Sequence, residues 1–112
     1  MSDSLNAIGN VLPKNIALLA LDFDGVLTDN KVYVRQDGQE WVKCSRGDGM
    51  GISEIKKIGV LVVVFSTEKN PVVSARCEKL QIECIQGCED KAAVLKKYLE
   101  ENNIDPADVV FV

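Results

Sequence analysis

The chain has 112 residues, a formal net charge of −4 and no histidine. Its length suffices for one domain of ordinary size, and 46% hydrophobic with 27% charged residues is the balance of a globular domain. The negative charge, without a basic cluster, argues against non-specific binding to nucleic acid. The absence of histidine excludes His-based catalytic triads and most mixed zinc sites.

The cysteines indicate the compartment rather than a site. Cys84 and Cys88 have the spacing C-x3-C, but Cys44 and Cys77 form no matching pair, so buried free thiols are favoured over a metal–thiolate site. The stretch MSDSLNAIGNVLPK has neither the layout of a signal peptide nor a long apolar span. We therefore expect the protein in the reducing cytoplasm.

Taken in chain order, residues 1–15 are expected to be a short leader, with a helical turn over 5–12 that Pro13 ends. The apolar run at 16–23 is too short for a membrane span and is typical of a parallel strand that is buried on both faces. Similar runs predict further strands at 60–65, 82–85 and 109–112.

Three helices are predicted between these strands. The first covers 48–58, where isoleucines recur every third position and Gly59 ends the segment. The second covers 71–80 and opens with Asn70 as N-cap before a proline. The third covers 90–102 and is expected to bury one stripe, formed by Ala92, Leu95 and Leu99. The alternation predicts an α/β fold with a parallel sheet between two helical layers.

One segment breaks this alternation. Residues 31–43 are predicted as a β-hairpin around an Asp-Gly dipeptide at 37–38, which is favoured in two-residue type I′ loops. That loop would place Arg35 opposite Glu40 and would leave apolar residues, Trp41 among them, on both faces of the ribbon. Because an isolated hairpin is barely stable in water, we expect it to cover a pocket or to pack against another subunit. A purely decorative hairpin is disfavoured.

Polar residues follow the predicted strands at the edge where open parallel sheets bind ligands. The first strand delivers Asp22 and Asp24, and the second delivers Ser66 and Thr67. Lys91 follows the third strand after a short loop. Two carboxylates so close together repel each other, so they need a shared proton or a cation between them. Mg²⁺ would satisfy that need and attract a phosphate.

These residue types fit phosphoryl transfer. Asp22 can attack phosphorus, and Asp24 can protonate the departing alkoxide and then deprotonate a water. Ser66 suits a phosphate oxygen, and Lys91, a cation placed unfavourably at a helix start, can neutralise the transferring group. Taken alone, Ser66 also fits a plain loop residue and Lys91 a solvated one. Asp29 is most simply a turn or cap residue.

The stretch DFDGVLTD, residues 22–29, resembles the first motif of the haloacid dehalogenase (HAD) superfamily of phosphohydrolases. Ser66 after VVVF resembles the second motif, and Lys91 in EDK resembles the third. The hairpin followed directly by GDGMGI resembles the branch without a cap domain. That branch contains octulosonate 8-phosphate and nonulosonate 9-phosphate phosphatases and the phosphatase-like domain of some acylneuraminate cytidylyltransferases.

The resemblance implies an HAD-like Rossmannoid domain over 16–112 and a Mg²⁺-dependent sugar-phosphate phosphatase that forms a phosphoaspartate. It implies Asp22 as nucleophile and metal ligand, and Asp24 as general acid/base with its carbonyl on the metal. Ser66 and Lys91 would hold the phosphoryl group, with Thr67 beside them. It also implies a homo-oligomer, typically a tetramer, in which the hairpins pack together.

This chain departs from the family pattern at three places. Arg46 is shifted from the usual Arg-Asp-Gly and is not assigned to the substrate. Thr67 and Glu68 stand where octulosonate enzymes tend to have Gly-Arg. Glu68 with Lys69 is more similar to sialic-acid-type relatives, so both are candidate substrate ligands and a nonulosonate 9-phosphate is favoured. The fourth motif, with a further Mg²⁺ ligand, is expected after DVVFV, so the domain is expected to be truncated at Val112.

Two alternatives to a phosphatase use the same residues. One is a non-catalytic module of the same fold that holds an oligomer together beside a nucleotidyltransferase. The other is a phosphoacceptor receiver domain, which also uses strand-end Asp, Ser/Thr and Lys. Receivers keep the acid pair and the acceptor on different strands, whereas Asp22 and Asp24 share one, so the receiver ranks last.

Overall fold

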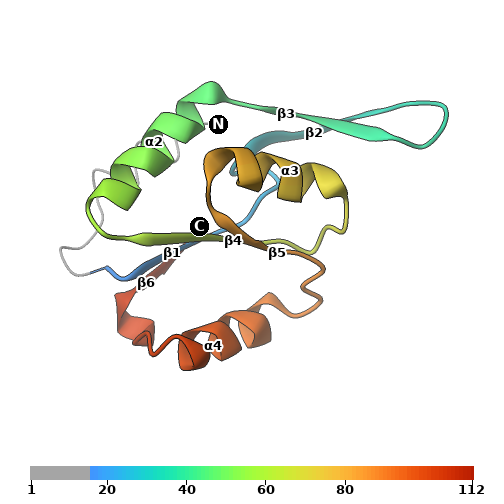
Figure 1. Ribbon diagram of the computed structural model, residues 1–112. Helices are drawn as coiled ribbons and strands as arrows, with labels where there is room; N and C mark the ends of the chain where they lie inside the picture. Colours follow the sequence, from blue (N-terminus) through green and yellow to red (C-terminus); the bar gives the residue numbers. More distant parts are fainter. Residues whose placement is uncertain (1–15) are drawn as a thin grey trace.

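The computed structural model describes residues 16–112, in which a four-stranded parallel sheet carries helices on both faces (Figure 1). In chain order the elements are β1 Leu18–Leu21, β2 Thr28–Val34, β3 Glu40–Cys44, α2 Arg46–Lys57, β4 Leu61–Phe65, α3 Pro71–Leu80, β5 Glu83–Ile85, α4 Lys91–Glu101, the 3-10 helix η1 Pro106–Asp108 and β6 Val109–Phe111. The strand order is β5-β4-β1-β6 and every neighbouring pair is parallel. The α/β prediction is confirmed, while the helical turn predicted over 5–12 lies outside the described residues.

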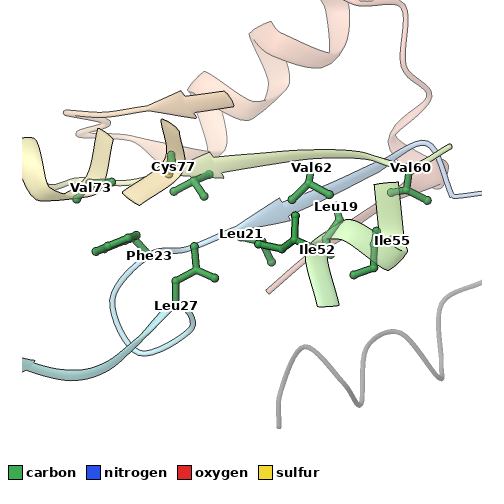
Figure 2. Close-up of a cluster of buried hydrophobic side chains, with 11 residues drawn as sticks. Leu19, Leu21, Phe23, Leu27, Ile52, Ile55, Val60, Val62, Val73 and Cys77 are labelled. Carbon is green, nitrogen blue, oxygen red and sulfur yellow. The ribbon is translucent and has the colours of Figure 1, made fainter. Parts of the chain in front are cut away.

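The central strand β1 joins two hydrophobic cores. Leu19 and Leu21 point into the core under α2 and α3 (Figure 2), whereas Leu18 and Ala20 point into the core under α4. Side chains alternate between the two faces of a strand, so a strand covered on both faces must be apolar at every position. All four residues of β1 are fully buried. This double burial fixes the position of the acids that follow.

Side chains of the residues just before each helix cap its first turn. The Oγ of Ser45 accepts a hydrogen bond from the N–H of Gly47 at 3.2 Å, so α2 starts two residues earlier than predicted. The side chain of Asn70 accepts from the N–H of Val72 at 3.0 Å, and α3 has the predicted bounds. Each cap satisfies a backbone N–H that has no partner within the helix. None of the helices within 16–112 is long and apolar enough to cross a membrane.

The buried stripe of α4 differs from the predicted one. Ala92 is exposed, and the buried residues are Tyr98 and Leu99. The Tyr98 ring packs edge-on against Phe65 with centroids 5.6 Å apart, and its hydroxyl donates to a Glu83 carboxylate oxygen at 2.8 Å. These contacts turn the Tyr98 side of the helix toward the sheet. Leu95 and Leu99 pack in the core as predicted, whereas the prediction was wrong for Ala92.

The hairpin also has a different register from the predicted one. Val34 pairs with Glu40 and Tyr33 pairs with Trp41, a shift of one position. The loop has three residues, 36–38, because the N–H of Arg35 donates to the carbonyl of Gln39 at 2.8 Å and Gly38 has a φ of 88°. A glycine in the left-handed region at the end of the loop is the mark of a three-residue hairpin, so the two-residue type I′ prediction was wrong.

The observed register separates Arg35 from Glu40. Arg35 lies over the Trp41 ring, 5.9 Å from its centroid, and pairs with Asp37 at 3.7 Å. Apolar residues do occupy both faces of the ribbon as predicted, with Val32, Tyr33, Val34 and Trp41 all more than half exposed. The ribbon extends past α3 and away from the sheet (Figure 1).

Candidate active site

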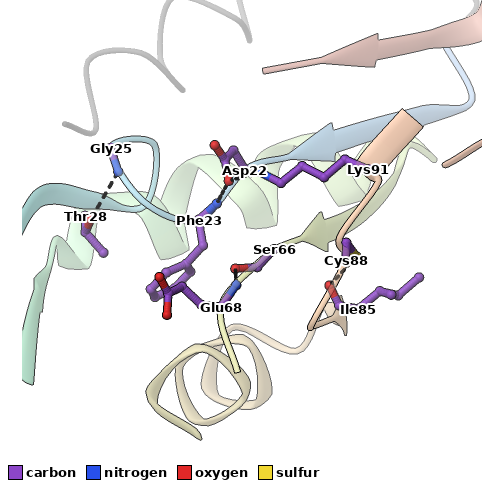
Figure 3. A network of polar contacts seen from close by, with 9 residues as sticks. All are labelled: Asp22, Phe23, Gly25, Thr28, Ser66, Glu68, Ile85, Cys88 and Lys91. Carbon is purple, nitrogen blue, oxygen red and sulfur yellow. Dashed lines mark hydrogen bonds and ion pairs between the residues drawn. The ribbon is translucent and has the colours of Figure 1, made fainter. Parts of the chain in front are cut away.

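Asp22 stands directly after β1 and forms an ion pair with the start of α4. Its Oδ1 accepts hydrogen bonds from Lys91 Nζ at 2.7 Å and from the N–H of Phe23 at 2.9 Å (Figure 3). The two side chains remain 36% and 26% exposed, so a ligand can reach them. Both donors approach Oδ1, and within residues 16–112 no hydrogen bond occupies Oδ2. Asp22 therefore has one oxygen held by donors and one available to a ligand.

A tight turn after Asp24 brings the second carboxylate back to the same edge. Phe23, between the two acids, is fully buried and anchors the turn. Gly25 adopts a φ of 79°, a conformation that glycine reaches without steric cost. Its N–H donates to Thr28 Oγ1 at 3.1 Å, and the N–H of Asn30 donates to the same oxygen at 3.1 Å. Thr28 is buried, so this hydroxyl holds the turn from within.

The surroundings of Asp24 shift the pKa of its carboxyl group. Its pKa is raised, first by partial burial, then by the negative charge of Asp22, and to a lesser degree by Glu40, while Lys91 opposes the shift. A carboxyl group with a raised pKa holds its proton more readily than an ordinary aspartic acid. This property suits a group that must donate a proton to a leaving oxygen.

Ser66 is held rigidly at the end of β4. It is buried, its N–H donates to the carbonyl of Ile85 at 2.9 Å, and its own carbonyl accepts from the N–H of Cys88 at 2.9 Å. Its Oγ accepts from the N–H of Glu68 at 3.1 Å (Figure 3), which leaves the hydroxyl proton free for a ligand. Thr67, the next residue, is exposed.

A pocket of about 210 Å³ opens beside Asp24, between the hairpin and the start of α3. Its polar lining residues are Asp24, Asn30, Glu40, Glu68 and Asn70, and its walls are apolar. Glu68 therefore faces this pocket, as a substrate ligand would. Lys69 is not among the lining residues of the described part of the chain, and its side chain lies beside Gly87.

The acid pair fits the preferences of Mg²⁺. This ion takes oxygen ligands and is commonly held by one or two carboxylates together with waters and substrate phosphate. Within residues 16–112, no group of three or more His, Cys, Asp or Glu side chains is arranged to hold a metal. Asp22 and Asp24 match the sparser arrangement. The pKa of Asp24 is raised first by burial and then by the charge of Asp22, and a cation would relieve the second of these effects.

Comparison with known proteins agrees with a site for phosphoryl transfer. No family model matches the chain. The 3-deoxy-D-manno-octulosonate 8-phosphate phosphatase of Salmonella typhi is 34% identical over 100 residues, which are 88% of this chain and 53% of that protein. A solved structure from Streptomyces avermitilis, assigned to the HAD hydrolases, is 43% identical with a TM-score of 0.85 over 90% of this chain and 59% of that one. The resemblance to the HAD superfamily is confirmed.

The match to these HAD proteins is partial in length. The chain spans about half the length of the curated phosphatases that it matches. It is also 27% identical to N-acylneuraminate cytidylyltransferase A of Danio rerio over 108 residues. This alignment covers 93% of this chain but 25% of that protein. The HAD-like region therefore occurs both in phosphatases and within a larger cytidylyltransferase.

Sequence reasoning found the residues of the three HAD-like motifs but missed part of the surroundings. Asp29 is exposed and accepts from the N–H of Lys31 at 3.1 Å, but it lies in strand β2, so the prediction of a turn or cap residue was wrong. Arg46 is exposed at the start of α2, consistent with leaving it unassigned. Thr28 and Glu40 were missed. The threonine lies inside the quoted DFDGVLTD motif, whereas Glu40 could be found only from the correct hairpin register.

Proposed function

We propose that this protein acts as a Mg²⁺-dependent phosphatase on a sugar phosphate of the octulosonate 8-phosphate or nonulosonate 9-phosphate type. The observation that carries the proposal is the 2.7 Å contact between Lys91 Nζ and Asp22 Oδ1, beside Asp24. Similarity to octulosonate 8-phosphate phosphatases supports the substrate class. We propose residues 16–112 as the HAD-like phosphatase domain.

The first step uses Asp22 as nucleophile. Its free Oδ2 attacks phosphorus, an Asp–O–P bond forms, and the bond between phosphorus and the sugar oxygen breaks. Asp24 gives its proton to that leaving oxygen, so the sugar departs as a neutral alcohol. Lys91 and Ser66, with Thr67 as a weaker candidate, stabilise the charge on the phosphoryl oxygens by donating hydrogen bonds.

The second step regenerates the enzyme. Asp24, now a carboxylate, takes a proton from a water molecule whose oxygen attacks the phosphorus of the phosphoaspartate. The Asp–O–P bond breaks, and inorganic phosphate leaves Asp22 as a free carboxylate. Asp24 ends the cycle protonated, as it began.

Mg²⁺ would be held by Asp22 and by the carboxylate or carbonyl of Asp24. When bound, it supplies positive charge that offsets the repulsion between an anionic nucleophile and a phosphate dianion. Lys91 already provides one positive charge at Asp22, and with the ion the site would hold two cationic groups around the phosphoryl position.

The test measures phosphate release from octulosonate 8-phosphate and nonulosonate 9-phosphates, with and without Mg²⁺. We expect turnover that requires the metal and is lost in Asp22→Asn, because the amide cannot attack phosphorus. Asp29→Asn, which removes an exposed carboxylate at the start of β2, is the matched control and should keep its activity. A folded protein that releases no phosphate from any of these esters contradicts the proposal, and a long-lived phosphoaspartate would favour the receiver alternative.

A non-catalytic module is the second candidate, because the chain also resembles part of a cytidylyltransferase. We do not favour it, because holding an oligomer together does not require the Asp22–Lys91 ion pair or a Ser66 hydroxyl whose proton is free for a ligand. We further propose a homo-oligomer, a tetramer by analogy with the family, with the exposed Tyr33 and Trp41 face of the hairpin at the contact. The four free cysteines fit the reducing cytoplasm.

A further inference from the structure

The pocket beside Asp24 has an unusual charge for a site that would receive a phosphate ester. Three carboxylates, from Asp24, Glu40 and Glu68, line its 210 Å³, and no lysine or arginine is among the lining residues of the described chain. Asp24 lines this pocket and is two residues from Asp22, the residue at which the phosphoryl group would bind. The pocket is therefore where the leaving group of the ester would sit.

The hairpin register determines what Glu40 can do. In the predicted register Arg35 would face Glu40 and neutralise it. In the observed register Glu40 pairs with Val34, and it shares a ribbon face with Val32 and Val42, which both line the pocket. Arg35 is engaged on the opposite face with Trp41. Within residues 16–112, no hydrogen bond or ion pair occupies the carboxylate of Glu40.

Glu68 reaches the pocket from the opposite side. It follows β4 in the loop before α3, and its backbone N–H is bound to Ser66 Oγ at 3.1 Å. Within the described residues its carboxylate, like that of Glu40, has no hydrogen-bond donor or cation beside it. The pocket thus presents two unengaged carboxylates, one on the hairpin and one in the loop that follows β4.

We propose that Glu40 is a specificity-determining residue that, with Glu68, selects phosphate esters whose leaving group carries hydroxyls and no carboxylate next to the phosphate. The inference rests on the proposed function and adds the class of leaving group. Ionised carboxylates only accept hydrogen bonds, so hydroxyl donors satisfy them, whereas a carboxylate on the ligand would face like charges at short range. Specificity here comes from repulsion of a ligand carboxylate as well as from hydrogen bonds to ligand hydroxyls.

The effect depends on distance. A carboxylate at the far end of a long sugar chain can remain outside the pocket, where water and salt screen it. A carboxylate two carbons from the phosphate-bearing oxygen cannot. The structure therefore predicts tolerance for long sugar acids that are phosphorylated at the end opposite their carboxylate, and rejection of short acid phosphates.

Two matched pairs of esters test this inference. Glycerol 3-phosphate and 3-phosphoglycerate differ by a carboxylate close to the phosphate, whereas glucitol 6-phosphate and 6-phosphogluconate differ by a distant one. With Mg²⁺ present, we expect kcat/KM to favour glycerol 3-phosphate by about 10-fold or more and the two longer esters to differ by less than about threefold. Glu40→Gln keeps the size of the side chain and should lower the first ratio about 10-fold while leaving the second unchanged.

Glu78→Gln, on the exposed side of α3 away from the pocket, removes the same charge and should leave both ratios unchanged. A first ratio that Glu40→Gln leaves unchanged, or a wild-type preference for 3-phosphoglycerate, overturns the inference while the phosphatase proposal stands. Absence of turnover on all four esters and on the sugar phosphates overturns both. Calorimetric binding of the four esters to Asp22→Asn, with and without Glu40→Gln, should show the same ratios without turnover.

Discussion

The Nζ of Lys91 lies 2.7 Å from Oδ1 of Asp22, although 69 positions separate the two residues in the chain. Asp22 directly follows the central strand β1, and Lys91 is the first residue of helix α4. Parallel topology brings the carboxyl ends of β1, β4 and β5 to one edge, so residues from three distant segments meet there. The contact is thus a product of the fold rather than of local sequence.

Replacement of this lysine should reduce catalysis much more than stability. We expect Lys91→Gln to lower kcat/KM by about 100-fold or more, because it removes a preorganised cation from the phosphoryl position. The free energy of unfolding should change by less than about 1 kcal/mol, since a partly exposed ion pair contributes little. Steady-state kinetics and urea unfolding measure the two quantities.

The matched control is Lys97→Gln. Lys97 belongs to the same helix and pairs with Glu101 at 3.8 Å on the exposed surface. Its replacement should leave kcat/KM within about twofold of the wild type, because the pair is solvated and distant from the acids. Equal loss of activity in both variants would contradict a specific role for Lys91.

Substitution of the glycine in the first loop tests the turn that returns Asp24 to the site. Gly25→Ala places a Cβ 3.6 Å from Asn30 Cβ, an ordinary contact, so its cost comes from the backbone φ of 79°. We expect a loss of about 1–2 kcal/mol in the free energy of unfolding and a marked fall in kcat. Gly49→Ala, within α2, is the control, and it should be neutral or stabilising because alanine favours a helix.

Thr28 offers a second test of the same loop. Thr28→Val keeps the shape of the side chain but removes the oxygen that accepts from Gly25 and Asn30. Two backbone N–H groups would lose their partner next to a buried side chain, and we expect a loss of about 1–3 kcal/mol in unfolding free energy. Thr67→Val, at an exposed position, should change stability by less than about 0.5 kcal/mol in the same urea titration.

Stability should fall at alkaline pH because two buried groups resist ionisation. Burial raises the pKa of Cys77 from 9.0 to about 12, and burial with the bond to Glu83 raises the pKa of Tyr98 from 10.0 to about 12. Both groups are neutral in either state at low pH. Above pH 9 for the thiol, and above pH 10 for the phenol, the unfolded chain loses the proton while the folded chain keeps it, which favours unfolding.

The measurement is the free energy of unfolding in urea, with a reductant, from pH 8 to pH 11. Each group adds a downward slope of up to about 1.4 kcal/mol per pH unit inside its window. Tyr98→Phe should remove its share of the slope above pH 10, and Cys77→Ala its share above pH 9. Slopes identical to that of the wild type would show that neither group carries the effect.

The sequence was most informative where local rules dominate. Strand β1 was recognisable because a strand buried on both faces must be apolar at every position, and the acids that end it stood out against that background. The bounds of α3 were predicted correctly because Asn70 and the following proline mark a helix start by capping geometry alone. The loop containing Asp22 and Asp24, and the likeness of its motif to the HAD superfamily, were likewise visible without a structure.

The tertiary structure decided the relations that depend on packing. Asp37 and Gly38 can take part in a two-residue or a three-residue loop, and a shift of one position changes which residue faces Arg35. The structure places Arg35 over Trp41 and leaves Glu40 on the face that lines the pocket. The sequence by itself thus determined the order of the helices and strands, because strong local preferences encode it, and it singled out the candidate site residues. Only the tertiary structure decided which charges share the pocket, because that depends on contacts between segments far apart in the chain.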